Sequence, residues 1–123
     1  MKIRVLIVDD SAMMRRLLTQ IIEQSPDFEV VGAAPDAQSA RELIKELNPD
    51  VLTLDVNMPR MDGFELIEAI RAAPELRGVP ILVLSTEFSE EKKSRARSAG
   101  ATGWITKPFD AAKLGAAIRR VAA

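Results

Sequence analysis

The 123-residue sequence contains no cysteine and no histidine. The lack of cysteine excludes disulfide bonds and thiolate metal sites. The lack of histidine excludes serine–histidine–aspartate triads, imidazole zinc sites and general base catalysis by histidine. Any chemistry that this chain performs must therefore rest on its carboxylates and lysines.

The chain also lacks a charge excess and a long hydrophobic run. Its 17 Lys and Arg residues balance 18 Asp and Glu residues, giving a formal net charge of −1, so no overall field attracts nucleic acid or a membrane. The first apolar run, residues 3–8, is too short for a signal segment or a membrane span. We therefore expect a cytoplasmic monomer without nucleic-acid binding or membrane insertion, in which residues 1–123 form one domain.

Short apolar runs alternate with longer segments of helical periodicity. The runs predict strands at 29–34, which is weaker and mixed, and at 3–8, 51–54, 80–84 and 102–105. Helices are expected at 11–24, 36–47, from 62, at 90–99 and from 110. Right-handed crossovers then favour an α/β fold with a doubly wound, five-stranded parallel sheet of order 2-1-3-4-5, a flavodoxin-like (βα)5 arrangement.

The predicted helix at 90–99 has little to bury. Its sequence, EEKKSRARSA, offers only Ala96 and Ala99 to a core, and charge pairs such as Glu90 with Lys93 support it instead. Such a thinly anchored helix is either a moving part beside a reactive edge or an ordinary solvated helix.

Polar side chains stand at the ends of four predicted strands. Asp9 and Asp10 follow the first, Asp55 the third, Ser85 the fourth and Lys107 the fifth. Because the carboxyl ends of parallel strands share one edge, these side chains should converge where open α/β sheets bind ligands. Three carboxylates, a hydroxyl and an ammonium there predict a magnesium-assisted phosphoryl-transfer site.

The roles within this site follow from the donor chemistry. Asp10 and Asp55 are predicted as direct Mg²⁺ ligands, Asp9 as a nearby or water-bridged one, and the carbonyl of Asn57 as a further oxygen ligand. Asp55 can attack a phosphorus atom to form an acyl phosphate. Lys107 and Ser85 can then hold the phosphoryl oxygens.

Other readings of these residues remain open. Each one alone has an ordinary structural use, as a helix cap, a turn residue or a loop lysine. A phosphatase with an aspartyl-phosphate intermediate would usually carry its nucleophile first in a pair of aspartates separated by one residue. A flavodoxin-type binding module would need a phosphate-cradling loop after the first strand, where this chain has two acids.

Four motifs carry a resemblance to a known family across the whole chain. VLIVDDS, LTLDVNMPRMDG, LVLST and TKPF resemble, in order and spacing, the response-regulator receiver domain of two-component signalling. The resemblance implies that Asp55 accepts a phosphoryl group from a histidine kinase and that Asp9 and Asp10 hold Mg²⁺. It further implies a switch formed by Ser85 and Trp104, and a cis bond between Lys107 and Pro108.

The same resemblance sets expectations for activity and partners. It implies a regulatory phosphoacceptor with self-catalysed phosphorylation and dephosphorylation rather than a turnover enzyme. The signal should pass to a protein target through the fourth helix, the fifth strand and the fifth helix. The first half of the chain resembles a chemotaxis methylesterase receiver and the second half a stand-alone chemotaxis regulator. A lone docking domain and a methylesterase fragment therefore both remain open.

The sequence departs from the family pattern at two positions. Trp104 stands where tyrosine or phenylalanine is commoner, and the larger indole should restrict in-and-out rotation. Thr86 stands where a smaller residue would leave the phosphoryl group more open, so we expect hindered access there. Asn57 and Glu87 lie beside the site in sequence and are expected to influence the phosphoryl lifetime together with Thr86.

Overall fold

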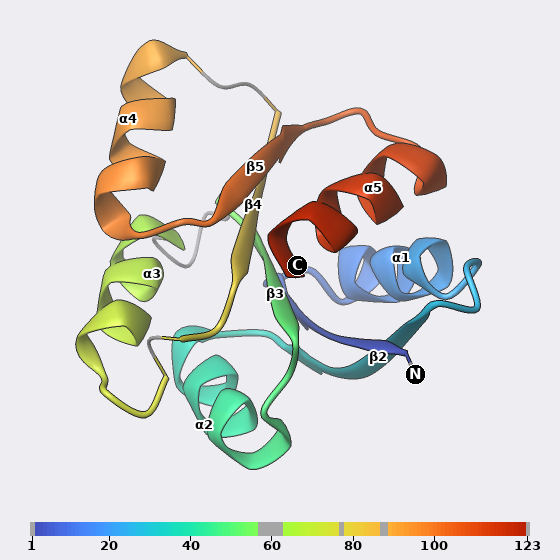
Figure 1. The fold of residues 1–123 in the computed structure, drawn as a ribbon, viewed down its shortest axis with the longest axis horizontal. Coiled ribbons are helices and arrows are strands. Elements are labelled where there is room, and N and C mark those ends of the chain that lie inside the picture. The colour runs from blue at the N-terminus through green and yellow to red at the C-terminus, as the bar shows by residue number, and fades with distance from the viewer. Residues whose placement is uncertain (1, 57–62, 77, 87–88, 123) are drawn as a thin grey trace.

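The fold is a parallel sheet covered by helices on both faces (Figure 1). The computed structural model describes residues 2–56, 63–76, 78–86 and 89–122. The strands are β1 (Ile3–Val8), β2 (Phe28–Ala34), β3 (Val51–Asp55), β4 (Ile81–Ser85) and β5 (Gly103–Thr106). The helices are α1 (Ala12–Ile22), α2 (Ala37–Leu47), α3 (Gly63–Ala72), α4 (Glu90–Ala99) and α5 (Ala111–Ala122). Among the described residues the sheet order is β2-β1-β3-β4-β5, which confirms the predicted topology.

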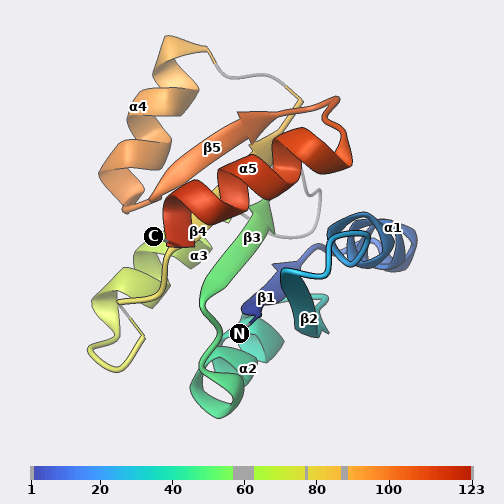
Figure 2. The ribbon, with the colours of Figure 1, turned by 45° about the vertical axis from the view of Figure 1, so that its right-hand side comes forward.

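Alternation along the strands divides the core into two layers. In β1, Leu6 and Val8 join the layer under α2, α3 and α4, while Val5 and Ile7 join the layer under α1 and α5. Figure 2 shows α1 and α5 together on one side of the sheet. The central strands β3 and β4 are buried along their whole length, as expected for parallel strands covered on both faces.

Two strands run one residue further than the sequence pattern predicts. Asp55 pairs with Leu84 and Ser85 pairs with Thr106 within the ladders. The prediction that these two polar residues follow their strands is therefore wrong by one position, because backbone pairing continues after the apolar run ends. As a result, Asp55 and Ser85 stand on paired backbone rather than in loops.

Local hydrogen bonds explain where the helices begin. The Ser11 hydroxyl accepts from the Met14 amide at 3.2 Å, so Ser11 caps α1. The Asp36 carboxylate accepts from the Ser39 amide at 2.8 Å and caps α2. This backbone hydrogen bond lowers the pKa of Asp36.

Helix α4 is attached mainly through α3. Ala96 and Ala99 are its buried residues, as the sequence predicts. The Arg95 guanidinium lies 4.5 Å from the centre of the Phe64 ring on α3, within cation–π range. The predicted Glu90–Lys93 pair forms at 3.9 Å, but the Glu90 side chain is 95% exposed, so this pair contributes little.

Arg71, at the end of α3, fixes the corner where α4 passes into β5. Its guanidinium donates to the carbonyl of Val79 at 2.6 Å and to the carbonyl of Gly100 at 2.9 Å. Gly100 ends α4 with a φ of 109°. A Cβ on Gly100 would lie 2.7 Å from Cγ of Arg71, so both the backbone conformation and the packing favour glycine here.

This corner generates a stability prediction. Gly100→Ala should lower the free energy of unfolding by about 1–2 kcal/mol, because an L-residue is strained in the left-handed region. The change is measured by urea unfolding at neutral pH.

Gly78→Ala is the matched control. A Cβ at Gly78 meets nothing within 4 Å, so this variant should stay within about 0.5 kcal/mol of the parent. Equal unfolding free energies for the two variants would contradict the strained cap.

Candidate functional site

The ends of the strands bring three of the predicted side chains into direct proximity. Asp9 follows β1, Asp55 ends β3 and Lys107 follows β5. The Lys107 ammonium donates to Oδ2 of Asp55 at 2.5 Å. The charges of both Asp55 and Lys107 act on Asp9. The predicted convergence of these three groups is therefore present in the structure.

Most of the polar atoms of Asp9 take part in hydrogen bonds. Its amide donates to the carbonyl of Ala34 at 3.1 Å, and its Oδ1 accepts from the Ser11 amide at 2.9 Å. The residue is only 2% exposed. Its second carboxylate oxygen, Oδ2, has no hydrogen-bond partner within the described part of the chain. That buried oxygen is available to a cation or a proton.

The electrostatics of Asp9 follow from this burial. Burial raises the pKa of Asp9, the Ser11 amide opposes the rise, and the nearby Asp55 carboxylate adds to it. Two carboxylates can share a hydrogen bond only if one of them is protonated, so their proximity favours either a proton or a cation between them. Lys107 partly offsets this repulsion.

The Asp55–Lys107 pair is only slightly open to solvent. The Asp55 side chain is 6% exposed and that of Lys107 is 20% exposed. The backbone of Lys107 is also fixed, because its amide donates to the carbonyl of Ser85 at 2.7 Å. The Lys107–Pro108 bond is cis, as the family resemblance implied. The carboxylate at the end of β3 therefore meets a lysine that follows β5 and whose backbone is bonded to β4, the strand between them.

Ser85 lies on the face of the sheet that α3 and α4 cover. It is fully buried, whereas the adjacent Thr86 is exposed. Ile81 and Val83 of the same strand pack under α3 and α4, so alternation places Ser85 on that face. Trp104 is half-buried against the same layer. Both predicted switch residues therefore belong to the α3–α4 side.

The remaining predicted ligands are less well defined. Asp10 is half-buried directly after Asp9. Asn57 and Glu87 lie outside the described residues, so the predictions for them stay predictions. Within the described ranges, no three acidic side chains are grouped tightly enough to enclose a metal ion by themselves.

The donor set nevertheless fits Mg²⁺. This ion typically keeps several waters and takes only one or two protein carboxylates, so a complete protein cage is not required. The buried, unpartnered Oδ2 of Asp9 beside Asp55 is a hard oxygen donor of the kind that Mg²⁺ prefers. Asp10 and Asp55 are the other candidate ligands.

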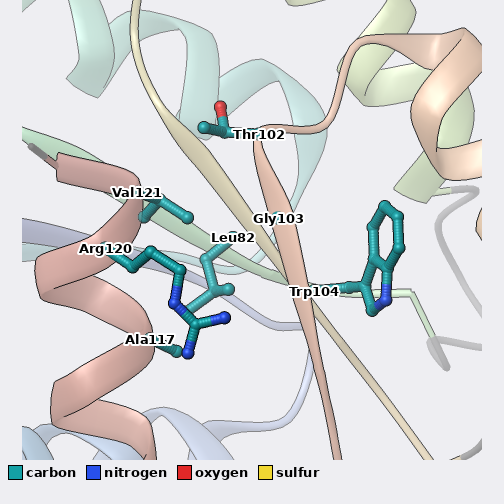
Figure 3. Close-up of a pocket in the computed structure, with 7 residues that line it drawn as sticks. All are labelled: Leu82, Thr102, Gly103, Trp104, Ala117, Arg120 and Val121. Atoms are coloured by element: carbon teal, nitrogen blue, oxygen red, sulfur yellow. The ribbon is translucent and has the colours of Figure 1, made fainter.

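A hollow lies apart from the carboxylates, along the edge strand β5 (Figure 3). It has a volume of about 320 Å³ and is lined by Leu82, Thr102, Gly103, Trp104, Ala117, Arg120 and Val121. Figure 3 shows the indole of Trp104 across the β5 ribbon from Arg120 on α5. The Arg97 guanidinium of α4 lies 5.6 Å from the Trp104 ring centre. This edge thus joins α4, β5 and α5 in one surface.

Sequence reasoning missed one residue at the carboxylate edge. The Arg15 guanidinium donates to the backbone carbonyl of Asp9 at 2.8 Å. Arg15 lies four residues after the cap Ser11, one helical turn along α1. That spacing was the available signal, although adjacent Arg16 carries the same side chain and is exposed.

The chain is similar to known proteins over most of its length. A family model for the response regulator receiver domain matches residues 5–119. Protein-glutamate methylesterase/protein-glutamine glutaminase 1 of Dechloromonas aromatica (strain RCB) is 57% identical over 109 residues, 87% of this chain and 30% of that protein. The chain thus spans less than a third of the length of this relative. The likeness to methylesterases also extends beyond the first half of the chain.

Two solved structures share the fold. The response regulator domain of Thermotoga maritima CheB is 36% identical with a TM-score of 0.85, covering 99% of this chain and 97% of that chain. The chemotaxis protein CheY4 of Vibrio cholerae is 38% identical with a TM-score of 0.88, covering 98% of this chain and 99% of that chain.

The raised pKa of Asp9 leads to a prediction about pH. The pKa of Asp9 is higher in the folded than in the unfolded state, so protonation of this carboxyl stabilises the folded state at low pH. This contribution to the free energy of unfolding is lost as the pH rises through the folded pKa. In metal-free buffer at neutral pH, Asp9→Asn should therefore be more stable than the parent, with a flatter pH dependence above the unfolded pKa. Chemical unfolding with EDTA across pH 4–8 measures both quantities.

Glu46→Gln removes the same formal charge from an exposed position on α2 and serves as the control. It should leave both the stability and the pH dependence close to those of the parent. An Asp9→Asn variant that is less stable than the parent at neutral pH would show that the carboxylate is not under repulsion.

Proposed function

The chain belongs to the response regulator receiver domain family, and we propose that it is a phosphorylation-controlled switch of a two-component chemotaxis pathway, acting in the cytoplasm. The observation that carries this proposal is the buried Asp55–Lys107 pair beside Asp9 at the sheet edge. It combines a nucleophile, a cation for phosphoryl oxygens and an oxygen donor for a metal ion.

The proposed reaction transfers a phosphoryl group from a kinase histidine to Asp55. A carboxylate oxygen of Asp55 attacks the phosphorus, the new P–O bond forms, and the P–N bond to the imidazole breaks. Bound Mg²⁺ would supply positive charge to the phosphoryl oxygens. Lys107 neutralises Asp55 before transfer and is in place to hold a phosphoryl oxygen afterwards.

Kinase contact would use the surface next to this edge. Helix α1 begins three residues after Asp9 and exposes two large apolar side chains, Met13 at 70% and Leu17 at 45%. Exposed apolar groups of this size favour a protein partner when they lie together. The kinase supplies the phosphohistidine that this histidine-free chain lacks.

Phosphoryl loss would also depend on this chain's own residues. Water attacks the acyl phosphate and releases inorganic phosphate, which makes both gain and loss of the group self-catalysed. Thr86, which is exposed, is proposed to restrict the access of that water. Asn57 and Glu87 are proposed to affect the same rate.

Output would follow from the packing of α4. This helix has few buried residues and lies beside Trp104, which shares a sheet face with Ser85. Movement of Ser85 toward the added charge would shift the populations of Trp104 and α4. The changed α4-β5-α5 surface is the proposed docking site for the downstream protein.

A second reading concerns the context of the domain. The 57% identity to a methylesterase, of which the chain matches only 30%, favours the receiver part of such an enzyme over a stand-alone regulator. In that case the target surface would face the esterase part of the same polypeptide. None of the helices in the described part of the chain could span a membrane.

Phosphotransfer from acetyl phosphate tests the proposed function. The parent should become labelled with one phosphoryl group per chain when Mg²⁺ is present, and addition of EDTA should abolish the labelling. Asp55→Asn removes the nucleophile while preserving shape, so it should remain unlabelled under both conditions. Intact-mass spectrometry measures the occupancy.

Two further results of this assay bear on the mechanism. Thr86→Ala should gain and lose the label faster than the parent if Thr86 hinders access, whereas equal rates would remove its gating role. Steady phosphate release from aryl phosphate esters would instead indicate a phosphatase. A label on any side chain other than Asp55 would refute the proposal.

A further inference from the structure

We propose that Arg15 is a positioning residue for the cation site, holding the Asp9–Asp10 segment in the geometry that binds a divalent ion. The proposal rests on the function proposed above. Arg15 would not touch the phosphoryl group. It acts through the backbone carbonyl of Asp9, to which its guanidinium donates at 2.8 Å.

The hydrogen bonds around Asp9 support this role. The amide, the carbonyl oxygen and Oδ1 of Asp9 are all engaged, by Ala34, Arg15 and Ser11 respectively. Only Oδ2 is left without a hydrogen-bond partner in the described chain, and it is buried beside Asp55. Fixing the other three polar atoms determines where that oxygen lies. The clamped carbonyl also belongs to the peptide group that leads into Asp10.

Arg15 is itself well placed to act as a clamp. Its amide donates to the Ser11 carbonyl at 2.9 Å, and its own carbonyl accepts from the Thr19 hydroxyl at 2.7 Å. The residue is half-buried, and α1 is capped by Ser11. The guanidinium therefore links the capped first turn of α1 to the end of β1.

The positive charge of Arg15 and its proposed positioning role have opposite effects on the affinity for Mg²⁺, so the two can be told apart by experiment. A fixed positive charge near a cation site lowers the affinity for Mg²⁺. If charge dominated, removing Arg15 would strengthen Mg²⁺ binding. If positioning dominates, removing it should weaken binding, because groups that orient metal ligands typically affect affinity by 10- to 100-fold.

The experiment compares the same substitution at two adjacent positions. Isothermal titration calorimetry with MgCl₂ is performed on the parent, Arg15→Gln, Arg16→Gln and Arg15→Lys. Gln is shorter than Arg and should not reach the Asp9 carbonyl. Exposed Arg16 has the same charge, so Arg16→Gln reports the effect of charge alone.

We expect Arg15→Gln to bind Mg²⁺ roughly 10-fold more weakly than the parent. Arg16→Gln should bind within about twofold of the parent or slightly more tightly, and Arg15→Lys should recover most of the affinity because it retains a charged donor. Urea unfolding in EDTA reports whether each variant is folded. If Arg15→Gln proves unfolded, the milder Arg15→Lys carries the test. This variant should then bind Mg²⁺ measurably more weakly than the parent, and equal binding would refute the positioning role.

Two outcomes would overturn the inference. Equal or tighter Mg²⁺ binding by folded Arg15→Gln, in a protein whose parent is labelled on Asp55, would refute positioning while leaving the proposed function intact. A parent that neither binds Mg²⁺ nor accepts a phosphoryl group would overturn both.

Discussion

The rest of this site depends on the repulsion between buried carboxylates at the ends of parallel strands. Asp9 and Asp55 are 2% and 4% exposed, and water can do little to screen them. Lys107 offsets one negative charge directly, and the free oxygen of Asp9 leaves a place for a second cation. An edge that carries this unbalanced charge can respond strongly to a metal ion or to an added phosphoryl group.

The residues of the candidate site are divided between the two faces of the sheet. Strand alternation places Asp9 and Asp55 on the sheet face that α1 and α5 cover. It places Ser85 on the face that α3 and α4 cover, where Trp104 also packs. Strand alternation thus separates the groups proposed to react from the groups proposed to move. Helix α4 buries only Ala96 and Ala99, so little packing opposes its displacement. Arg71, by contrast, fixes the C-terminal end of α4 through Gly100.

Much of the fold could be predicted from the sequence because its signals are local. Continuous Val, Ile and Leu runs mark the central strands, and strand ends in a parallel sheet must meet at one edge, which brings Asp9, Asp55 and Lys107 together. Contacts of long side chains could not be predicted in this way. Arg71 bonds to residues up to 31 positions away, and only the four-residue spacing from Ser11 sets Arg15 apart from Arg16 in the sequence. The ends of β3 and β4 were also missed, because backbone pairing does not require an apolar side chain.

The most direct test of the central claim is the dependence of folding stability on Mg²⁺. If the carboxylate edge is relieved by a divalent ion, the free energy of unfolding should rise with MgCl₂ concentration, by about 2.7 kcal/mol at 100 times the dissociation constant. The rise should be much smaller when Asp55 is replaced by Asn. Unfolding curves for the parent that are the same in MgCl₂ and in EDTA, at matched ionic strength, would contradict the account.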